Sequence, residues 1–164
     1  MRRTFVVMAA LLLGSFFVGA KEATAQGRFG VAHVTNRTRG NMSFYYQLVW
    51  NYGKANARVH KNWVKRTIPP GKTLTVYYAY QNAAAKSPDL VVVFDSLRKA
   101  GAHWQKVILQ KAQSPDYKDP RYGYKYELRY DNANQRYASI YPQKRGKGKV
   151  YIVDRKVSRP PRVQ

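Results

Sequence analysis

The segment from Tyr124 to Pro142 limits the fold of this chain more than any other feature. From Tyr124 to Asp131, a tyrosine or leucine alternates with a charged residue. A period of two places apolar and charged side chains on opposite faces of a β-strand. Residues 131–134, with the sequence DNAN, supply turn chemistry, and a second alternating run follows from Tyr137. The segment is therefore predicted to form a β-hairpin.

The length of the hairpin loop decides which side chains are exposed. With a four-residue loop, 132–135, the tyrosines of both strands share one face and belong to the core. With a three-residue loop, 132–134, Tyr137 and Tyr141 lie instead on the outer face with the charged side chains. The inner face then holds Tyr126, Leu128, Tyr130, Ala138 and Ile140. We favour the second register because it groups the apolar side chains, and it predicts an exposed strip of aromatic and basic residues.

Most of the remaining chain reads as short strands separated by turns, with almost no helical periodicity. The apolar run from Leu90 to Phe94 is typical of a strand covered on both faces, and we expect it in the core. Residues 53–62 and 111–123 are expected to be irregular connections. Together these patterns predict one all-β domain, residues 26–157, of about eight to nine short strands. An antiparallel β-sandwich is the favoured architecture and a closed β-barrel the alternative; residues 158–164 are expected to form a flexible basic tail.

Residues 1–25 have the composition of a signal peptide. Two arginines precede an apolar run that ends near Ala20, and the ATA sequence at 23–25 provides the small residues of a cleavage site. The apolar run is too short and wrongly flanked for a membrane-spanning helix. We therefore expect an exported protein, periplasmic or extracellular. The absence of cysteine excludes disulfides, and a disulfide-free exported chain is more typical of a bacterial envelope than of an oxidising secretory pathway.

The charge of the chain points to anionic partners. The 30 Lys and Arg residues exceed the 8 Asp and Glu residues and give a formal net charge of +22. Loss of residues 1–25 would leave this excess almost unchanged. A field of this size attracts polyanions and bears on partners rather than on fold. The candidate partners are a cell-wall polymer, an acidic polysaccharide and a nucleic acid.

Basic residues beside tyrosines indicate where such a partner would bind. Tyrosine rings stack on bases or sugars while Lys and Arg hold phosphates or carboxylates. The alternative explanation is that tyrosine has a high strand propensity and its neighbours are solvated charges. The predicted polyanion-binding residues come from the hairpin and from residues 143–149, the basic loop that follows it. They are Lys125, Arg129, Arg136, Tyr137, Tyr141, Lys144, Arg145, Lys147 and Lys149.

Catalytic and metal-binding signals are weak. The three histidines, His33, His60 and His103, are far apart in sequence and follow no metal-ligand spacing. We expect no metal and no cofactor, and we expect His33 and His103 to be hydrogen-bonded structural residues. No nucleophile elbow or phosphate-binding loop is present. Asp95 ends the apolar run that is expected in the core, and an acid in such surroundings can have a shifted pKa.

The sequence thus predicts an exported, noncatalytic binding or structural module of the bacterial envelope that associates with an anionic polymer. One alternative is an enzyme that cleaves a polyanion with His60, His103 or Asp95 as its acid and base. A second alternative is a module that assembles with other proteins through an exposed sheet edge.

Overall fold

A computed structural model describes residues 28–80, 86–96, 103–131, 137–144 and 147–163. The described residues form ten β-strands and no helix. The expected signal peptide, residues 1–25, lies outside them. The strands are β1 (Phe29–Asn36), β2 (Met42–Trp50), β3 (Arg58–Ile68), β4 (Thr73–Ala79), β5 (Asp89–Asp95), β6 (Trp104–Leu109), β7 (Ala112–Ser114), β8 (Tyr124–Tyr130), β9 (Ala138–Pro142) and β10 (Val150–Val157).

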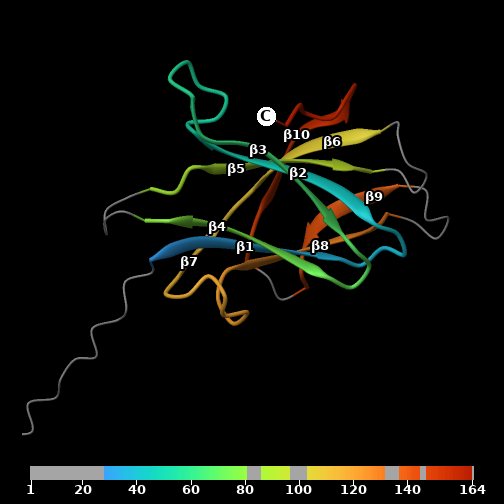
Figure 1. Ribbon diagram of the computed structural model, residues 1–164, viewed down its shortest axis with the longest axis horizontal. Helices are drawn as coiled ribbons and strands as arrows, with labels where there is room; N and C mark the ends of the chain where they lie inside the picture. Colours follow the sequence, from blue (N-terminus) through green and yellow to red (C-terminus); the bar gives the residue numbers. More distant parts are fainter. Residues whose placement is uncertain (1–27, 81–85, 97–102, 132–136, 145–146, 164) are drawn as a thin grey trace, which may run out of the picture.

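The strands form two five-stranded sheets that face each other (Figure 1). Sheet A has the order β4-β1-β8-β9, with β7 also paired to β1, and sheet B has the order β10-β6-β5-β2-β3. Both sheets end in edge strands and remain separate. The fold is therefore sandwich-like, as predicted, and is not the closed barrel that the sequence left as an alternative.

The core lies between the two inner faces. Sheet A contributes alternate residues of β1, β4, β8 and β9, and sheet B contributes alternate residues of β2, β5 and β6. The apolar run of β5 is fully buried, as predicted. Leu90, Val92 and Phe94 face the main core, whereas Val93 packs with Tyr45 and Trp104 in a second cluster on the other side of sheet B. This arrangement covers β5 on both faces.

Sheet A is mixed rather than antiparallel throughout. β1 and β8 run parallel, with His33 opposite Lys125 and Asn36 opposite Leu128. The prediction of an antiparallel sandwich is wrong at this pair. Parallel neighbours require a long crossover connection. Here the connection contains β2 to β7, of which β2, β3, β5 and β6 belong to sheet B, whereas β4 and β7 pair with β1 itself. Alternation in sequence identifies the inner face of a strand but does not identify its neighbours.

The hairpin forms with the predicted faces and a longer loop. Tyr130 pairs with Ala138, and the backbone N–H of Asp131 donates to the carbonyl oxygen of Tyr137 over 2.9 Å. The loop therefore comprises residues 132–136, which lie outside the described residues. This pairing differs by two residues from the favoured register. The faces are nevertheless as predicted, because a shift of two residues preserves the side-chain alternation.

Two expected connections contain strands. β3 begins at Arg58, within the segment 53–62, and β7 lies within the segment 111–123. The first five residues of β3 are exposed and show no alternation, so only pairing with β2 makes them a strand. β7 has three residues and depends on β1 for its hydrogen bonds. Among the described residues, no helix is long and apolar enough to cross a membrane.

Candidate anion-binding groove

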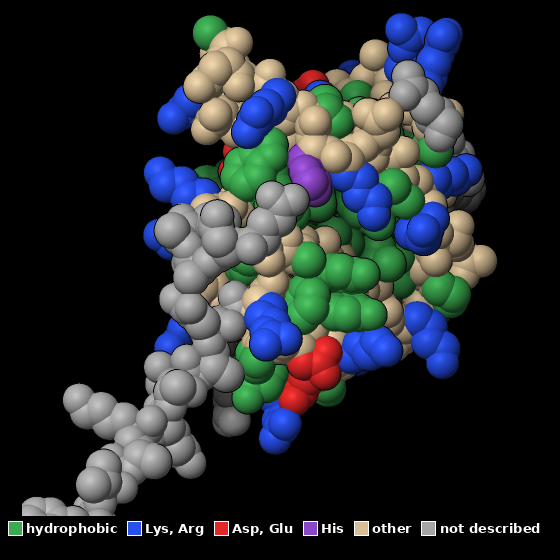
Figure 2. Space-filling model, turned by 60° about the vertical axis from the view of Figure 1, so that its left-hand side comes forward, with side chains coloured by type: hydrophobic (Ala, Val, Ile, Leu, Met, Phe, Trp, Pro, Cys, Tyr) green, Lys and Arg blue, Asp and Glu red, His purple; other side chains and the backbone are tan. Residues whose placement is uncertain are grey.

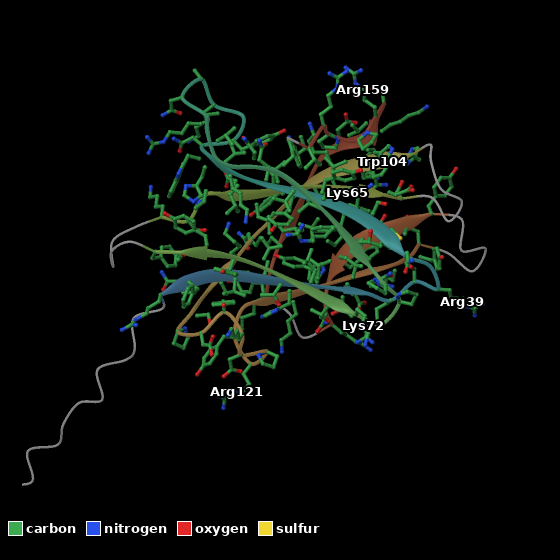
Figure 3. All side chains as sticks on the ribbon, viewed as in Figure 1. Arg39, Lys65, Lys72, Trp104, Arg121 and Arg159 are labelled. Carbon is green, nitrogen blue, oxygen red and sulfur yellow. The ribbon has the colours of Figure 1, made fainter. Side chains whose placement is uncertain are left out.

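Basic side chains are distributed over the whole surface, so charge alone does not locate a site. Arg39, Lys72, Arg121 and Arg159 point outward on different sides of the molecule (Figure 3). One concave region nevertheless concentrates basic side chains. It is an open groove of about 660 Å³, referred to below as the basic groove, on the outer face of sheet A beside β8. Its charged lining consists of Arg37, Arg121, Lys125, Lys144, Lys147 and Glu127.

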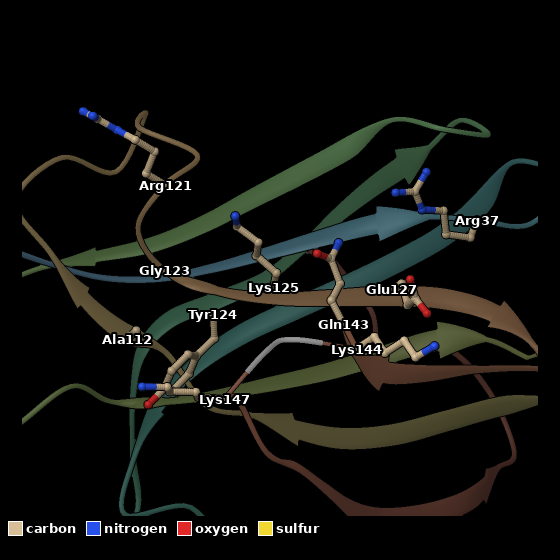
Figure 4. A pocket seen from close by; sticks show the side chains of 10 residues that line it. All are labelled: Arg37, Ala112, Arg121, Gly123, Tyr124, Lys125, Glu127, Gln143, Lys144 and Lys147. Atoms are coloured by element: carbon tan, nitrogen blue, oxygen red, sulfur yellow. The ribbon is translucent and has the colours of Figure 1, made fainter.

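The cations of the basic groove lie in two rows. Figure 4 shows Arg121, Lys125 and Arg37 along one side, and Lys147 and Lys144 along the other. Lys125 belongs to the outer face of β8, because the flanking residues of that strand point inward. The rows leave an elongated surface between them, which suits an extended anion better than a compact one.

Three separate parts of the chain supply the first row. Parallel pairing places the end of β1 beside β8, and the backbone N–H of Arg37 donates to the carbonyl oxygen of Leu128 over 2.7 Å. Arg121 precedes β8, and Asp119 accepts from the Arg121 guanidinium at 2.6 Å. This ion pair lowers the pKa of Asp119. The row therefore depends on the tertiary fold and not on a contiguous motif.

The second row follows β9. The backbone N–H of Gln143 donates to the carbonyl oxygen of Lys125 over 2.9 Å, which fixes the chain as it leaves the strand. Beyond Lys147, the phenol of Tyr126 donates to the carbonyl oxygen of Gln110 over 2.8 Å and lies 3.1 Å from that of Lys149. Burial raises the pKa of Tyr126. A buried neutral phenol thus anchors the end of the basic loop.

Four of the five groove cations have no carboxylate partner among the described residues. Within the described part of the chain, two side-chain ion pairs occur, Arg121 with Asp119 and Arg129 with Glu127 at 3.2 Å. The second pair engages the one acidic residue of the basic groove. Arg37, Lys125, Lys144 and Lys147 therefore present their charge to solvent. Like charges gathered in one concavity raise the local positive potential and attract an anion.

The predicted binding residues divide into several groups. Lys125, Lys144 and Lys147 line the basic groove. Lys149 is exposed but does not line it, and its backbone is held by Tyr126 and Gln110. Arg136 and Arg145 lie outside the described residues.

The remaining predicted residues are engaged with other protein groups. The Arg129 guanidinium lies over the ring of Tyr141, 4.2 Å from its centroid, and the Tyr141 hydroxyl donates to Asp131 over 2.8 Å. The ring of Tyr137 contacts that of His103 at 5.8 Å between centroids. The strip of aromatic and basic residues therefore exists, but its aromatic part is internally paired and lies outside the basic groove.

Arg37 and Arg121 were not among the predicted binding residues. Arg121 is adjacent to Tyr122, and a basic residue beside a tyrosine is the pattern that predicted binding residues elsewhere in the chain. Arg37 carries no such signal, since it reads as part of a turn. Its place in the basic groove depends on the parallel pairing of β1 with β8, which sequence alternation does not indicate.

His33 is a structural residue, as expected. Its Nε2 lies 2.8 Å from the carbonyl oxygen of Tyr122 and its Nδ1 2.9 Å from the hydroxyl of Thr75. Nε2 therefore carries the proton, and Nδ1 accepts from Thr75. Burial lowers the pKa of His33, with a smaller contribution from the charge of Lys125. The ring links β1 to β4 and to the loop before β8.

His103 forms a hydrogen-bonded pair with Ser96 that has the wrong polarity for a nucleophile. The Ser96 hydroxyl donates to the carbonyl oxygen of His103 over 2.9 Å and lies 2.5 Å from the ring Nδ1. Because the single hydroxyl proton is already donated, the imidazole acts as the donor to Ser96. The Ser96 side chain is also fully buried. The pair joins the end of β5 to the start of β6.

His60 and His103 do not converge. His60 lies near the residue of β3 that pairs with Leu48, and Leu48 also pairs with Leu90 at the start of β5. His103 precedes β6 at the other end of β5, where Asp95 lies. The two histidines are therefore separated by the length of β5, about 17 Å at roughly 3.4 Å per residue. Asp95 is buried, as its position predicted.

The described residues contain no group of three or more His, Cys, Asp and Glu side chains arranged to hold a metal ion. No family model, curated protein or solved structure matches the chain. The geometry of the basic groove is therefore the basis for assigning a function.

Proposed function

We propose that the protein is an exported, noncatalytic binding module of the bacterial envelope that holds a linear anionic polymer in the basic groove. The observation that carries this proposal is a set of four cations that line one concavity and have no carboxylate partner in the part of the chain that the structure describes: Arg37, Lys125, Lys144 and Lys147. Leaving like charges together costs free energy through repulsion. A bound polyanion relieves that repulsion.

An extended polymer fits the two rows of cations better than a compact anion does. Each row runs along the direction of β8, so successive charged groups of a chain would meet successive cations (Figure 4). Each contact would release a counterion from the polymer, and several such contacts add up to useful affinity. The ring of Tyr124 also lines the basic groove and offers one apolar surface beside the charges.

The composition of the basic groove favours carboxylate or phosphate as the recognised group and leaves three polymers as candidates: a cell-wall polymer, an acidic polysaccharide and a nucleic acid. Export is supported by the leader-like composition of residues 1–25. The same binding would give the protein a structural role in the envelope if the protein contacted a second envelope component while it held the polymer.

The experiment compares two triple variants with equal net charge. In the groove variant, Lys125, Lys144 and Lys147 are replaced by Ser; in the control, Lys65, Lys72 and Lys156, which lie outside the basic groove, are replaced by Ser. Binding of polygalacturonate, polyphosphate and oligothymidylate is measured by calorimetry at several salt concentrations. The groove variant should lose at least about tenfold in affinity, and the slope of log K against log salt should fall by about 2.

The control variant should retain most of the affinity, because its three charges contribute only to the general field. Equal losses in the two variants would show that the charge acts diffusely, and the proposal of a specific groove would be wrong. An affinity that does not change with salt would contradict the polyanion proposal itself.

A further inference from the structure

A second concavity lies at the β4 edge of sheet A, away from the basic groove. It is a cleft of about 410 Å³ between the edge strands β3 and β4, referred to below as the edge cleft. Figure 2 brings forward the side of the sandwich on which β4 ends and β5 begins; hydrophobic side chains gather in its middle, and Lys and Arg side chains surround them. The volume falls within the range of about 300–1,000 Å³ that is typical of small-ligand sites.

A β-bulge directs two consecutive side chains of β3 to this cleft. Val59 pairs with Val49 and Lys61 pairs with Leu48, so His60 is an extra residue with no partner position on β2. In a regular strand, neighbouring side chains point to opposite faces. Both His60 and Lys61 nevertheless line the edge cleft. Bulges re-aim side chains in this way and are over-represented beside functional sites.

Aromatic rings line the cleft, with Tyr78 at their centre, and Trp50 packs against Tyr78 from outside the lining. The Tyr78 ring centroid lies 5.0 Å from that of His60, 5.5 Å from that of Tyr80 and 5.7 Å from that of Trp50. All three contacts are edge-to-face. Because no two of these rings face each other in parallel, the wall offers a single apolar surface and no slot that would sandwich a flat base.

Polar groups stand at the mouth of the cleft. The Lys61 ammonium lies 5.5 Å from the ring centroid of Tyr46 and has no carboxylate partner in the described part of the chain. His60 is exposed, and neither of its ring nitrogens is hydrogen-bonded to another described residue. The cleft thus combines an aromatic wall, one cation and an imidazole that can donate or accept.

From this combination we infer that the edge cleft binds one acidic sugar residue of the uronate type. The apolar face of the sugar ring would lie against the aromatic wall, its carboxylate beside Lys61 and its hydroxyls within reach of His60. A neutral sugar would provide no anionic group to pair with the Lys61 ammonium. A nucleotide would also supply a negative charge and a flat base, and oligothymidylate therefore serves as the competing ligand in the test. The inference is independent of the basic groove.

The test measures binding of trigalacturonate to the full chain carrying the groove substitutions Lys125→Ser, Lys144→Ser and Lys147→Ser, which remove three of the five cations of the basic groove and weaken binding there. Lys61→Ser and His60→Ala are added one at a time, and Lys65→Ser serves as the matched control. Lys65 lies on the same strand at 5.7 Å from the ring of Tyr45 and does not line the cleft. Galactotriose and oligothymidylate are the comparison ligands, and the Trp indole and His ring signals are followed by NMR.

Trigalacturonate should bind, shift the signals of His60 and Trp50, and lose roughly tenfold or more in affinity on Lys61→Ser, as expected for a charge-assisted contact. Lys65→Ser should have little effect, and galactotriose should bind more weakly. The inference is overturned if Lys61→Ser and Lys65→Ser have equal effects, if galactotriose binds equally well, or if oligothymidylate binds more tightly and shifts the same signals. Failure here is distinguishable from failure of the basic groove, since three of the five groove cations are absent from the tested chain and the added substitutions change only the edge cleft.

Discussion

Gly148 lies where the basic loop crosses the side chains of β8. A Cβ atom at this position would come within 2.8 Å of the Tyr126 Cζ and 2.9 Å of the Tyr124 Cβ. The sequence around it, with lysines on both sides, reads only as a solvated basic loop. The requirement for glycine comes from the close approach of the loop to two tyrosines. Gly148 therefore helps to set the position of Lys147 at the basic groove.

Gly148→Ala is expected to destabilise the protein by about 1–3 kcal/mol, because the added methyl group meets a buried ring and the backbone of β8 restricts its movement. Urea unfolding measures the change. Gly40→Ala is the matched control: a Cβ there meets no atom within 4 Å, so its effect should stay within about 0.5 kcal/mol. Equal effects for the two substitutions would show that the Gly148 contact is not restrictive.

The candidate site shows how far single residues were predictable. Lys125, Lys144 and Lys147 were recognised because they lie in or just after the hairpin, where local alternation and loop composition are informative. Arg129 and Tyr141 were also recognised, but Arg129 pairs with Glu127 of its own strand. The hydrogen bond from Tyr141 to Asp131 crosses the hairpin and depends on its register. Arg37 was missed, because its contribution arises from the pairing of strands that are distant in sequence.

At the level of elements, His33 connects three segments. Its ring nitrogens join β1 to Thr75 on β4 and to the backbone of Tyr122, which precedes β8. The neutral ring satisfies both contacts: one nitrogen donates and the other accepts. Protonation would place a second donor against the Thr75 hydroxyl and a positive charge in a buried site near Lys125. Burial of the ring is the main cause of the lowered pKa of His33, and the positive charge of Lys125 lowers it further.

This linkage predicts a pH dependence of stability. In the unfolded chain His33 has its ordinary pKa of 6.5, so below that pH the unfolded state binds a proton that the folded state resists. Stability contributed by the neutral ring is therefore present above pH 6.5 and is lost as the pH falls below 6.5 toward the lowered pKa of the folded state. His33→Gln should remove this part of the pH dependence in urea unfolding, whereas His60→Gln should retain it. An unchanged profile in His33→Gln would contradict the role assigned to the ring.

The strands themselves were predictable where burial is one-sided. The inner faces of β2, β4 and β8 follow the alternation of their sequences, and β5 follows its continuous apolar run. The start of β3 and the whole of β7 escaped prediction because exposed edge segments have no apolar pattern, and hydrogen bonds to a partner strand define them. The parallel pairing of β1 with β8 escaped for a related reason: alternation specifies faces and leaves strand order undetermined.

At the scale of the whole molecule, the large positive charge has two components. Many Lys and Arg side chains point outward on all sides and produce a general field (Figure 3). The basic groove adds a local concentration of cations, four of which have no carboxylate partner among the residues that the structure describes. The general field accelerates encounter with polyanions and keeps copies of the chain apart. The groove determines where a captured polymer is held.

The most direct test of this account is a map of backbone amide chemical-shift changes on titration of the isotope-labelled protein with an anionic polymer at physiological salt. If the basic groove holds the polymer, the chemical-shift changes should be largest at Gly123, Lys125 and Gln143, which line the groove, and small at Lys65 and Lys156. Changes spread evenly over all basic regions, or centred away from the groove, would contradict the central claim that this groove holds the polymer.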